Sequence, residues 1–522
     1  MAAEMETADV VVVGGGPVGL MLACELGLAG VRPVVLERMP ARSPETKANG
    51  LVGQVVRFLD HRGLYERMGG GADIPRPVPS YLFGALPLHL GMLDVNPMAI
   101  LPAPQQRMEQ VLEERARELG ADIRRGHELT GMRQQEEGVT AEVRFPGGTY
   151  RLCGRHLVGC DGGKSTVRKL AGIPFPGVTG TGLVSRAAHA RLPHSALVPE
   201  TGELDVPGVG RISPLFTFTR TEHGVFAFAG LSNGDHRLFT LEWDPRPEGE
   251  EEKTQMTLGE MRDSVRRVLG ADLRLSPPSG PGPHMLRRLV GRNTRLAERY
   301  RSGRVLLAGD SAHVHSAVGG PGLNLGLQDA ANLGWKLAAD IHGWAPPGLL
   351  DTYHEERHLC GRRVFMHTQA QTALMAPGPE VTALRELFGE LLRSKDNTRR
   401  IADLLAGDDV RYATTSAHPL AGRFAPDLVL ETGDGPARLA ELMRSARPLL
   451  LDLTGAPHLA EAAADWKERV DVVTAGCPQP PAAALLVRPD GYVAWAAAPD
   501  EPADESRDGL RRALTCWFGE GG

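Results

Sequence analysis

The first thirty residues contain the pattern that most restricts the fold of this chain. A continuous apolar run at residues 10–13 predicts a strand that is buried on both faces. Glycines follow at positions 14, 16 and 19 in the spacing G-x-G-x-x-G, and a helical pattern then runs through residues 20–29. Strand, glycine-rich turn and helix in this order are typical of the start of a dinucleotide-binding domain.

Each of the three glycines has a distinct physical role in such a turn. Gly14 allows the tight turn, Gly16 lets the backbone approach a pyrophosphate, and Gly19 lets the helix pack closely on the strand. A second apolar run at residues 34–36 ends in Glu37, an acid placed to accept hydrogen bonds from an adenosine ribose. A carboxylate there disfavours a 2′-phosphate, so we expect FAD or NAD as the resident, with a ligand-free domain as the alternative.

Three later segments carry further short motifs. Asp161-Gly162 follows an apolar run at residues 157–160, Gly309-Asp310 follows one at residues 304–308, and Pro104-Gln105 precedes an amphipathic helix. With the N-terminal pattern, these motifs resemble the class A FAD-dependent aromatic hydroxylases, the para-hydroxybenzoate hydroxylase-like family. Within it, the chain is most similar to bacterial monooxygenases that tailor aromatic polyketides, such as angucycline hydroxylases. The resemblance covers nearly the whole chain.

The resemblance implies an α/β fold of three parts. A Rossmann-like FAD-binding domain of the GR2 type would comprise residues 1–177 and 285–410, with its connecting helices. A mostly antiparallel β-sheet domain for the substrate would be inserted at residues 178–284, with residues 75–103 contributing to it. Residues 411–522 would form a thioredoxin-like domain that lacks a CxxC pair and has a structural or dimerisation role, so a homodimer is one expectation.

The same resemblance implies which residues hold FAD. In the stretch GDSAHVHSAVGGPGLN, Asp310 would accept hydrogen bonds from the ribityl chain, with a catalytic acid as the alternative, and Gly319 would help admit the ring. Asn324 would donate to the ring edge or cap the following helix. The expected cofactor residues are Gly14, Gly16, Pro17, Val18, Gly19, Glu37, Arg38, Gln105, Leu129, Asp161, Gly162, Gly309, Asp310, Gly320, Gly322, Leu323 and Asn324.

Three residues depart from the pattern that relatives often show. Ala317 and Pro321 replace a proline and a glutamine, and Pro321 removes one N–H from the loop and fixes its φ. Lys47 stands where many relatives have an arginine near the flavin or nicotinamide, although a lysine cannot supply the same bidentate geometry. We regard Lys47 and Pro321 as candidate site residues, with simple solvation as the alternative for Lys47, and assign no certain catalytic residue.

The implied activity is that of a single-component monooxygenase in antibiotic biosynthesis. FAD, reduced by NAD(P)H with NADPH favoured, would form a C4a-hydroperoxide with O₂ and hydroxylate a polycyclic aromatic polyketide. Baeyer–Villiger oxygenation of a polyketide ketone is the first alternative. A non-catalytic protein that binds flavin and a drug is the second. In each case the cofactor carries the chemistry and the protein supplies position and electrostatics.

Aromatic residues alternate within the expected substrate domain. Phe216, Phe218, Phe226 and Phe228 recur at period two, so each pair shares one face of a sheet. Two interpretations remain open: a sheet face packed on a core, or an apolar cover over a flat polycyclic ligand.

Histidines in two places suggest other chemistry. The segment HEERH at residues 354–358 matches a zinc pattern by letters, but nothing nearby supplies a third ligand, so we predict no metal site and a solvated or salt-bridged helix. We expect His313 to pack or hydrogen-bond near the dinucleotide, with a proton relay as the alternative.

Composition excludes several classes of partner. The chain of 522 residues has a net charge of −6 and a calculated pI near 6.3, which gives no electrostatic reason to expect nucleic acid or an anionic membrane. No apolar run approaches the roughly 20 residues needed to span a bilayer. The sparse cysteines and the acidic N-terminus favour a cytoplasmic location.

Overall fold

The computed structural model describes residues 6–43, 49–71, 74–214, 217–231, 233–243, 255–280, 282, 284–315, 320–455 and 457–522. Four residues of interest, Lys47, Phe216, Ala317 and Gly319, lie outside the described residues.

The first sheet has the strand order of a dinucleotide-binding domain. Its main path runs β18 (Arg301–Ser302), β19 (Val305–Leu307), β10 (Gly148–Gly159), β1 (Glu6–Val13), β2 (Pro33–Glu37), β7 (Asp122–Arg125). The pairs β19–β10, β10–β1, β1–β2 and β2–β7 are parallel. Strands β8 (Glu128–Gln134) and β9 (Val139–Phe145) extend β10 as an antiparallel hairpin. Chain order reverses on the two sides of β1, which makes the gap between β1 and β10 a topological switch point.

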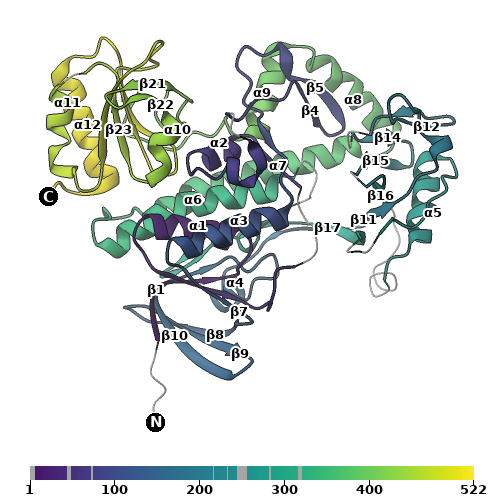
Figure 1. Cartoon of the computed structure of the whole chain (residues 1–522), viewed down its shortest axis with the longest axis horizontal. Coiled ribbons are helices and arrows are strands. Elements are labelled where there is room, and N and C mark those ends of the chain that lie inside the picture. The colour runs from purple at the N-terminus through teal and green to yellow at the C-terminus, as the bar shows by residue number, and fades with distance from the viewer. Residues whose placement is uncertain are drawn as a thin grey trace.

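Helices cover this sheet and bury its apolar strands. Helix α1 (Pro17–Leu28) packs between α3 (Gln105–Glu118) and the long α6 (Pro321–His342), and Figure 1 shows the three helices side by side above the strands. The residues of β1 from Val10 to Val13 are buried, as expected for a strand with neighbours on both faces. Shorter helices α2 (Gln54–Asp60) and α4 (Thr166–Leu170) flank this core.

A second sheet is inserted and is antiparallel throughout. Its order is β14 (Thr219–Thr221), β15 (Gly224–Gly230), β16 (His236–Trp243), β11 (Gly177–Ala190), β17 (Leu286–Leu296), β20 (His313–Val314). Helix α5 (Leu258–Leu269) packs on one face, against β11, β15 and β16. Strand β17 follows residue 284, so this sheet reaches further along the chain than the expected boundary, because β17 is the hydrogen-bonded neighbour of β11.

Residues 75–103 differ from the expectation that they form part of the substrate domain. Strands β4 (Ser80–Phe83) and β5 (Leu86–His89) form a separate hairpin, and β6 (Ile100–Leu101) pairs with β3 (Leu51–Val52). Phe83 and Leu88 pack with residues of α7 (Asp351–Met375) and α9 (Lys395–Ala406), close to α8 (Pro379–Leu391). Ala85 in the hairpin turn packs against a cluster of the inserted sheet, whereas the hydrophobic side chains of the strands are buried against the helices.

The C-terminal part is a third α/β unit, shown in yellow-green in Figure 1. Its strand order is β22 (Gly435–Arg438), β21 (Val429–Thr432), β24 (Asp471–Gly476), β23 (Leu449–Asp452), β25 (Ala484–Val487), β26 (Val493–Ala497). Only β23 and β24 run parallel. Helices α10 (Leu439–Leu442), α11 (Pro457–Ala462) and α12 (Ala503–Phe518) complete it. Its core includes Trp335 of α6, so it is packed directly onto the first domain.

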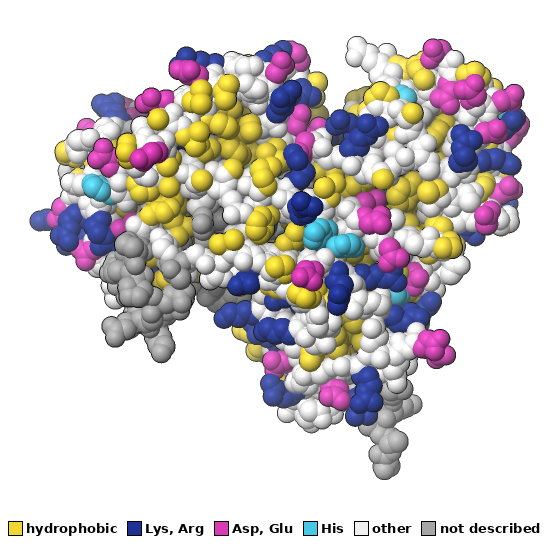
Figure 2. Space-filling model, turned by 180° about the vertical axis from the view of Figure 1, so that it is seen from behind, with side chains coloured by type: hydrophobic (Ala, Val, Ile, Leu, Met, Phe, Trp, Pro, Cys, Tyr) yellow, Lys and Arg dark blue, Asp and Glu magenta, His cyan; other side chains and the backbone are white. Residues whose placement is uncertain are grey.

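The surface carries both signs of charge. Figure 2 shows basic and acidic side chains occurring together over most of the visible face, which fits the small net charge of −6. Among the helices the structure describes, none is long and apolar enough to cross a membrane.

Candidate flavin site

Three of the four motifs meet at one edge of the first sheet. Gly14 follows β1, Glu37 ends β2, Asp161 lies just beyond β10, and Gly309 lies just beyond β19. In the register of the sheet, the last residues of β1, β2, β10 and β19 are hydrogen-bonded neighbours. Segments more than 290 positions apart in sequence therefore form a single rim at the carboxyl ends of parallel strands, where ligands bind in open α/β sheets.

The N-terminal glycines divide into two kinds. A Cβ on Gly14, whose φ is +111°, would lie 2.3 Å from the carbonyl oxygen of Cys160, and a Cβ on Gly19 would lie 2.0 Å from that of Gly14. At Gly16, by contrast, no described atom lies within 4 Å of an added Cβ. Gly14 and Gly19 therefore allow the turn and helix to pack, while Gly16 leaves open space beside the start of α1, which begins with Pro17.

Glu37 is held against this turn by backbone amides. Its Oε2 accepts a hydrogen bond of 2.7 Å from the N–H of Gly15, and its Oε1 accepts one of 2.8 Å from the N–H of Met39. A carboxylate can accept further bonds, so these two leave capacity for ligand hydroxyls. Next to it, Arg38 is exposed.

Two other expected cofactor residues lie in less open surroundings. Gln105 begins α3, and its Nε2 donates to Oε1 of Glu109 over 2.7 Å. Leu129 is buried in the main core.

Asp161 has a structural task that the sequence did not indicate. Its Oδ2 accepts from the amides of Thr166 and Val167 at 2.6 and 3.1 Å, and its Oδ1 accepts from the hydroxyl of Ser165. The carboxylate thus occupies the N-terminus of α4, where negative charge is favoured. The backbone of Gly162, with φ of +82° and no described atom near an added Cβ, is the open part of this motif.

The stretch from Gly309 to Asn324 brings an acid to the start of α6. Gly309 is buried with φ of +64°, and an added Cβ would meet Val18 at 3.0 Å. Asp310 is exposed, and its Oδ1 lies 3.9 Å from where a Cβ on Gly322 would be. Asp310 therefore faces the first turn of α6, beside Gly320, whose surroundings are open.

Pro321 and Asn324 occupy places that refine their expected roles. Pro321 is the first residue of α6, where the missing N–H has no intrahelical partner in any case and the restricted φ suits the helix. The side chain of Asn324 links two backbones: its Oδ1 accepts from the amide of Val52 and its Nδ2 donates to the carbonyl of Gly320, both at 3.0 Å. Asn324 thus fastens the helix start to the strand β3 and does not cap its amides.

These features fit a dinucleotide with a charged pyrophosphate and a planar ring. The N-cap residues of α1 and α6 are the glycines Gly16 and Gly320, which supply no side-chain cap, and a helix N-terminus carries a partial positive charge that suits phosphate and other anions. Open backbone at Gly16, Gly162 and Gly320 allows close approach, and Glu37 and Asp310 supply acceptors for hydroxyl groups.

Comparisons with known proteins identify this ligand. Residues 7–368 match the FAD binding domain family, and residues 418–521 match the aromatic-ring hydroxylase C-terminal family. The chain belongs to the FAD-binding aromatic-ring hydroxylases. It is a flavin-dependent monooxygenase, and the expected family and α/β fold with antiparallel sheets are confirmed.

Individual relatives are similar over their full length. The chain is 44% identical to a 12-dehydrotetracycline 5-monooxygenase/anhydrotetracycline 6-monooxygenase of Streptomyces rimosus, covering 98% of this chain and 99% of that one. Among solved structures, it is similar to an anhydrotetracycline hydroxylase from Streptomyces rimosus, with 41% identity, coverage of 99% and 100%, and a TM-score of 0.85. It is also similar to an aromatic hydroxylase from angucycline biosynthesis, with 38% identity, the same coverage and a TM-score of 0.84.

The inserted sheet of the hydroxylase places its aromatic residues on two opposite faces. Phe226 and Phe228 are fully buried under α5, in a cluster with Met261 and Val265. Of the two interpretations left open for these rings, the structure therefore supports a sheet face packed on a core, because α5 occupies their side of the sheet.

The face turned away from α5 carries a different aromatic set. Phe218 packs edge-on to Phe239, with ring centroids 5.8 Å apart, and Trp243 and Met375 belong to the same cluster. Sequence reasoning missed Phe239 and Trp243, although the alternation in HRLFTLEW places them on one face.

The two histidines of the HEERH segment in the hydroxylase pack beside Tyr300. The rings of His354 and His358 lie 4.8 Å apart and both contact the ring of Tyr300. Burial lowers the pKa of both imidazoles. Within the described ranges, no three His, Cys, Asp or Glu side chains are grouped as a metal would need.

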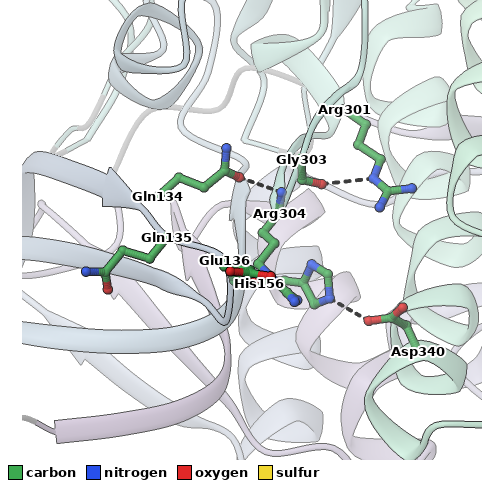
Figure 3. A pocket seen from close by; sticks show the side chains of 8 residues that line it. All are labelled: Gln134, Gln135, Glu136, His156, Arg301, Gly303, Arg304 and Asp340. Carbon is green, nitrogen blue, oxygen red and sulfur yellow. Dashed lines mark hydrogen bonds and ion pairs between the residues drawn. The ribbon is translucent and has the colours of Figure 1, made fainter.

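A separate hollow lies at the far end of α6. Its volume is about 570 Å³, and Figure 3 shows its lining of Gln134, Gln135, Glu136, His156, Arg301, Gly303, Arg304 and Asp340. Asp340 is 19 positions beyond Pro321 in α6, so the hollow lies roughly 28 Å along the helix from the flavin rim. Nε2 of His156 and Oδ2 of Asp340 in its lining are hydrogen-bonded at 2.7 Å, and the distance along α6 makes this hollow distinct from the cofactor site.

Proposed function

We propose that this monooxygenase hydroxylates a polycyclic aromatic polyketide at the expense of NAD(P)H, with NADPH favoured. In the overall reaction, one aromatic C–H, O₂, NADPH and a proton give a phenol, water and NADP⁺. The single observation that supports this substrate class most is the aromatic face of the inserted sheet. The similarity at 44% identity to a tetracycline-pathway monooxygenase supports the same class.

Bound FAD supplies the redox and oxygen chemistry, and the chain supplies its position. We assign Glu37 to the ribose hydroxyls and the first turn of α1 to the pyrophosphate, because acid and open backbone lie together there. Asp310 is assigned to the ribityl hydroxyls, since it faces the start of α6.

The first turn of α6 is proposed to hold the negatively charged edge of the reduced ring. Its free amides and macrodipole favour negative charge by roughly 0.3–2 kcal/mol. Pro321 presets the helix start, and Asn324 prevents it from shifting relative to β3.

The substrate is proposed to lie against the face that carries Phe218, Phe239 and Trp243. Flat aromatic rings stack well on such side chains, and the same apolar surface excludes water from the reacting atoms. Phe239 and Trp243 alternate along β16, so they present one continuous surface.

We further propose that residues 411–522 form a thioredoxin-like domain with a structural role, compatible with a homodimer. Strands β24, β23, β25 and β26 form the mixed order that supports this, with one parallel pair. The sequence has no CxxC pair, so disulfide exchange is not assigned to it.

The test is a screen of polycyclic aromatic phenols with the FAD-loaded enzyme. We expect substrate-dependent NADPH oxidation and a product with one added oxygen and a new phenolic carbon in its NMR spectrum. An ester or lactone carbonyl in the product would contradict hydroxylation and indicate Baeyer–Villiger oxygenation. NADPH consumption without any oxygenated product would contradict both. Assays without substrate and with NADH provide the baseline and the coenzyme preference.

A further inference from the structure

Asp329, in the middle of α6, is a buried acceptor that the proposed function does not use. Its Oδ2 accepts from the amide of Gly309 at 3.1 Å and from Nε2 of His313 at 2.6 Å. Its Oδ1 accepts from Nε of Arg357 at 2.8 Å. The side chains of Asp329, His313 and Arg357 are all buried, so these bonds are not shared with solvent.

The donors of the first two bonds lie on either side of Asp310 in the sequence. Gly309 directly precedes Asp310, and His313 follows it by three positions, so one carboxylate holds both sides of the turn that carries Asp310. Because Asp329 belongs to α6, the same contacts fix the turn relative to this helix. The position of Asp310 beside the first turn of α6 therefore depends on Asp329.

The third bond leads away from the rim to the C-terminal unit. Besides Asp329, Arg357 donates from Nη1 to the hydroxyl of Tyr412 at 2.9 Å and from Nη2 to the carbonyl of Leu325 at 3.1 Å. The ring of Tyr412 stacks on Tyr492 with centroids 4.1 Å apart. The guanidinium of Arg488 lies over both rings, at 5.2 and 5.8 Å.

We propose that Asp329 is a positioning residue for the flavin site, and that Tyr412, acting through Arg357, makes this position depend on the C-terminal unit. The proposal rests on the assignment of Asp310 to the flavin. The contacts run from Tyr412 through Arg357 and Asp329 to the turn at Gly309. A buried ion pair is a poor source of stability, because desolvation opposes its Coulomb attraction, but its directional bonds define one arrangement.

The first test compares two isosteric substitutions in the full chain loaded with FAD. Tyr412→Phe keeps the stacked ring and removes one of the acceptors of Arg357. Tyr492→Phe, the matched control, removes a hydroxyl from the same stack, one that donates to Oε1 of Gln54 at 2.9 Å. We expect Tyr412→Phe to weaken FAD binding about fivefold, the factor for one lost hydrogen bond, and to shift the visible flavin spectrum and reduction potential. Tyr492→Phe should change neither.

Equal effects of the two variants on FAD affinity, spectrum and potential would overturn the proposal, as would no effect of either. A second variant, Asp329→Asn, removes the charge at the hub and should shift the spectrum and potential further in the same direction as Tyr412→Phe. A shift in the opposite direction would also overturn it. If Asp329→Asn does not fold, the comparison of the two tyrosines decides alone.

A separate substitution tests the assignment of Asp310 to the flavin independently of the coupling to the C-terminal unit. Asp310→Asn should weaken FAD binding whether or not the C-terminal unit is coupled to it. If it leaves the FAD dissociation constant and spectrum unchanged, the proposed place of Asp310 is wrong. None of these measurements needs substrate, so they stand apart from the product analysis that tests hydroxylation.

Discussion

The Nζ of Lys336 lies 2.7 Å from Oε2 of Glu356, and both side chains are buried where α6, α7 and the C-terminal unit meet. Arg488 adds a bidentate pair to the same carboxylate, with bonds of 2.6 and 2.9 Å. Burial alone raises the pKa of Glu356, but the charges of Arg488 and Lys336 outweigh it and lower the pKa to about 2. The carboxylate therefore remains ionised across the ordinary pH range.

This pair predicts a loss of stability in acid. Between pH 4.5 and about 2 the unfolded chain binds a proton at Glu356 that the folded chain does not, so the free energy of unfolding falls as the pH falls. The contribution of this one group is about 3 kcal/mol. Urea unfolding between pH 6 and pH 3 measures the part of this loss that falls above pH 3. Glu356→Gln should be less stable at pH 6 and show a flatter pH profile; an unchanged slope would contradict the assignment.

Lys336 predicts a second rise of stability with pH, of the same sign but in alkali. Burial lowers its pKa to about 8, although Glu356 opposes this shift. Between pH 8 and 10.5 the unfolded chain holds a proton that the folded chain has released, so this group makes stability rise with pH. We expect Lys336→Met to lose that rise in urea unfolding curves measured from pH 7.5 to pH 10. Lys467→Met, a change on the C-terminal unit outside this cluster, is the control.

Two glycines of the first turn predict different effects of substitution, one on stability and the other on FAD binding. Gly19→Ala should lower the free energy of unfolding by about 1–3 kcal/mol or more, since its Cβ would lie 2.0 Å from the carbonyl oxygen of Gly14. Gly16→Ala should leave apoprotein stability unchanged, because its φ of −79° suits alanine and its surroundings are open. Its methyl group should still raise the FAD dissociation constant at least about tenfold. Thermal melts and FAD titrations distinguish the two effects; similar results for both variants would refute the division.

Glu37 predicts a charge-dependent loss of FAD. Glu37→Arg places a cation where the carboxylate accepts from Gly15 and Met39, and should yield protein that loses FAD on purification. Glu137→Arg, an exposed change of the same type between β8 and β9, is the control and should retain FAD. The ratio of flavin absorbance to protein absorbance gives the answer. Full retention by Glu37→Arg would exclude the ribose assignment.

The two faces of the inserted sheet predict different consequences for two phenylalanines. Phe239→Ala should raise the KM for a polycyclic substrate about tenfold, the loss expected when an aromatic contact is removed, with a small change in stability. Phe226→Ala, under α5, should instead lower the free energy of unfolding by about 3–5 kcal/mol and leave KM unchanged in the folded fraction. Steady-state kinetics and urea unfolding test both. If both variants alter KM alike, the assignment of the ligand face fails.

Much of the flavin rim could be predicted from local sequence. The glycine spacing, the apolar strand at residues 10–13 and the acid at Glu37 are properties of one continuous segment, in which backbone sterics require Gly14 and Gly19. Two later motifs, at Asp161 and Gly309, each follow an apolar run, so their common edge could be inferred from the rule that parallel strands end together. The helix start at Pro321 was equally local, since it depends on the residues on either side.

The errors arose where the answer depended on a distant partner. Period two placed Phe226 and Phe228 on one face, but only the packing of α5 decided that this face is core and that Phe239 and Trp243 face the other way. The sequence predicted that the hairpin β4–β5 belongs to the inserted sheet, whereas its apolar side chains pack against α7 and α9.

The sequence by itself determined the family and the cofactor, and it predicted which backbone segments form the rim. Tertiary structure alone decided which buried charges pair, because Asp329, Arg357 and Tyr412 are 28 and 55 residues apart along the chain and nothing local links them. It also decided that the C-terminal unit shares its core with α6 through Trp335. Spacing specifies contacts within a turn or a strand, whereas burial and ion pairing depend on which surfaces the whole chain brings together.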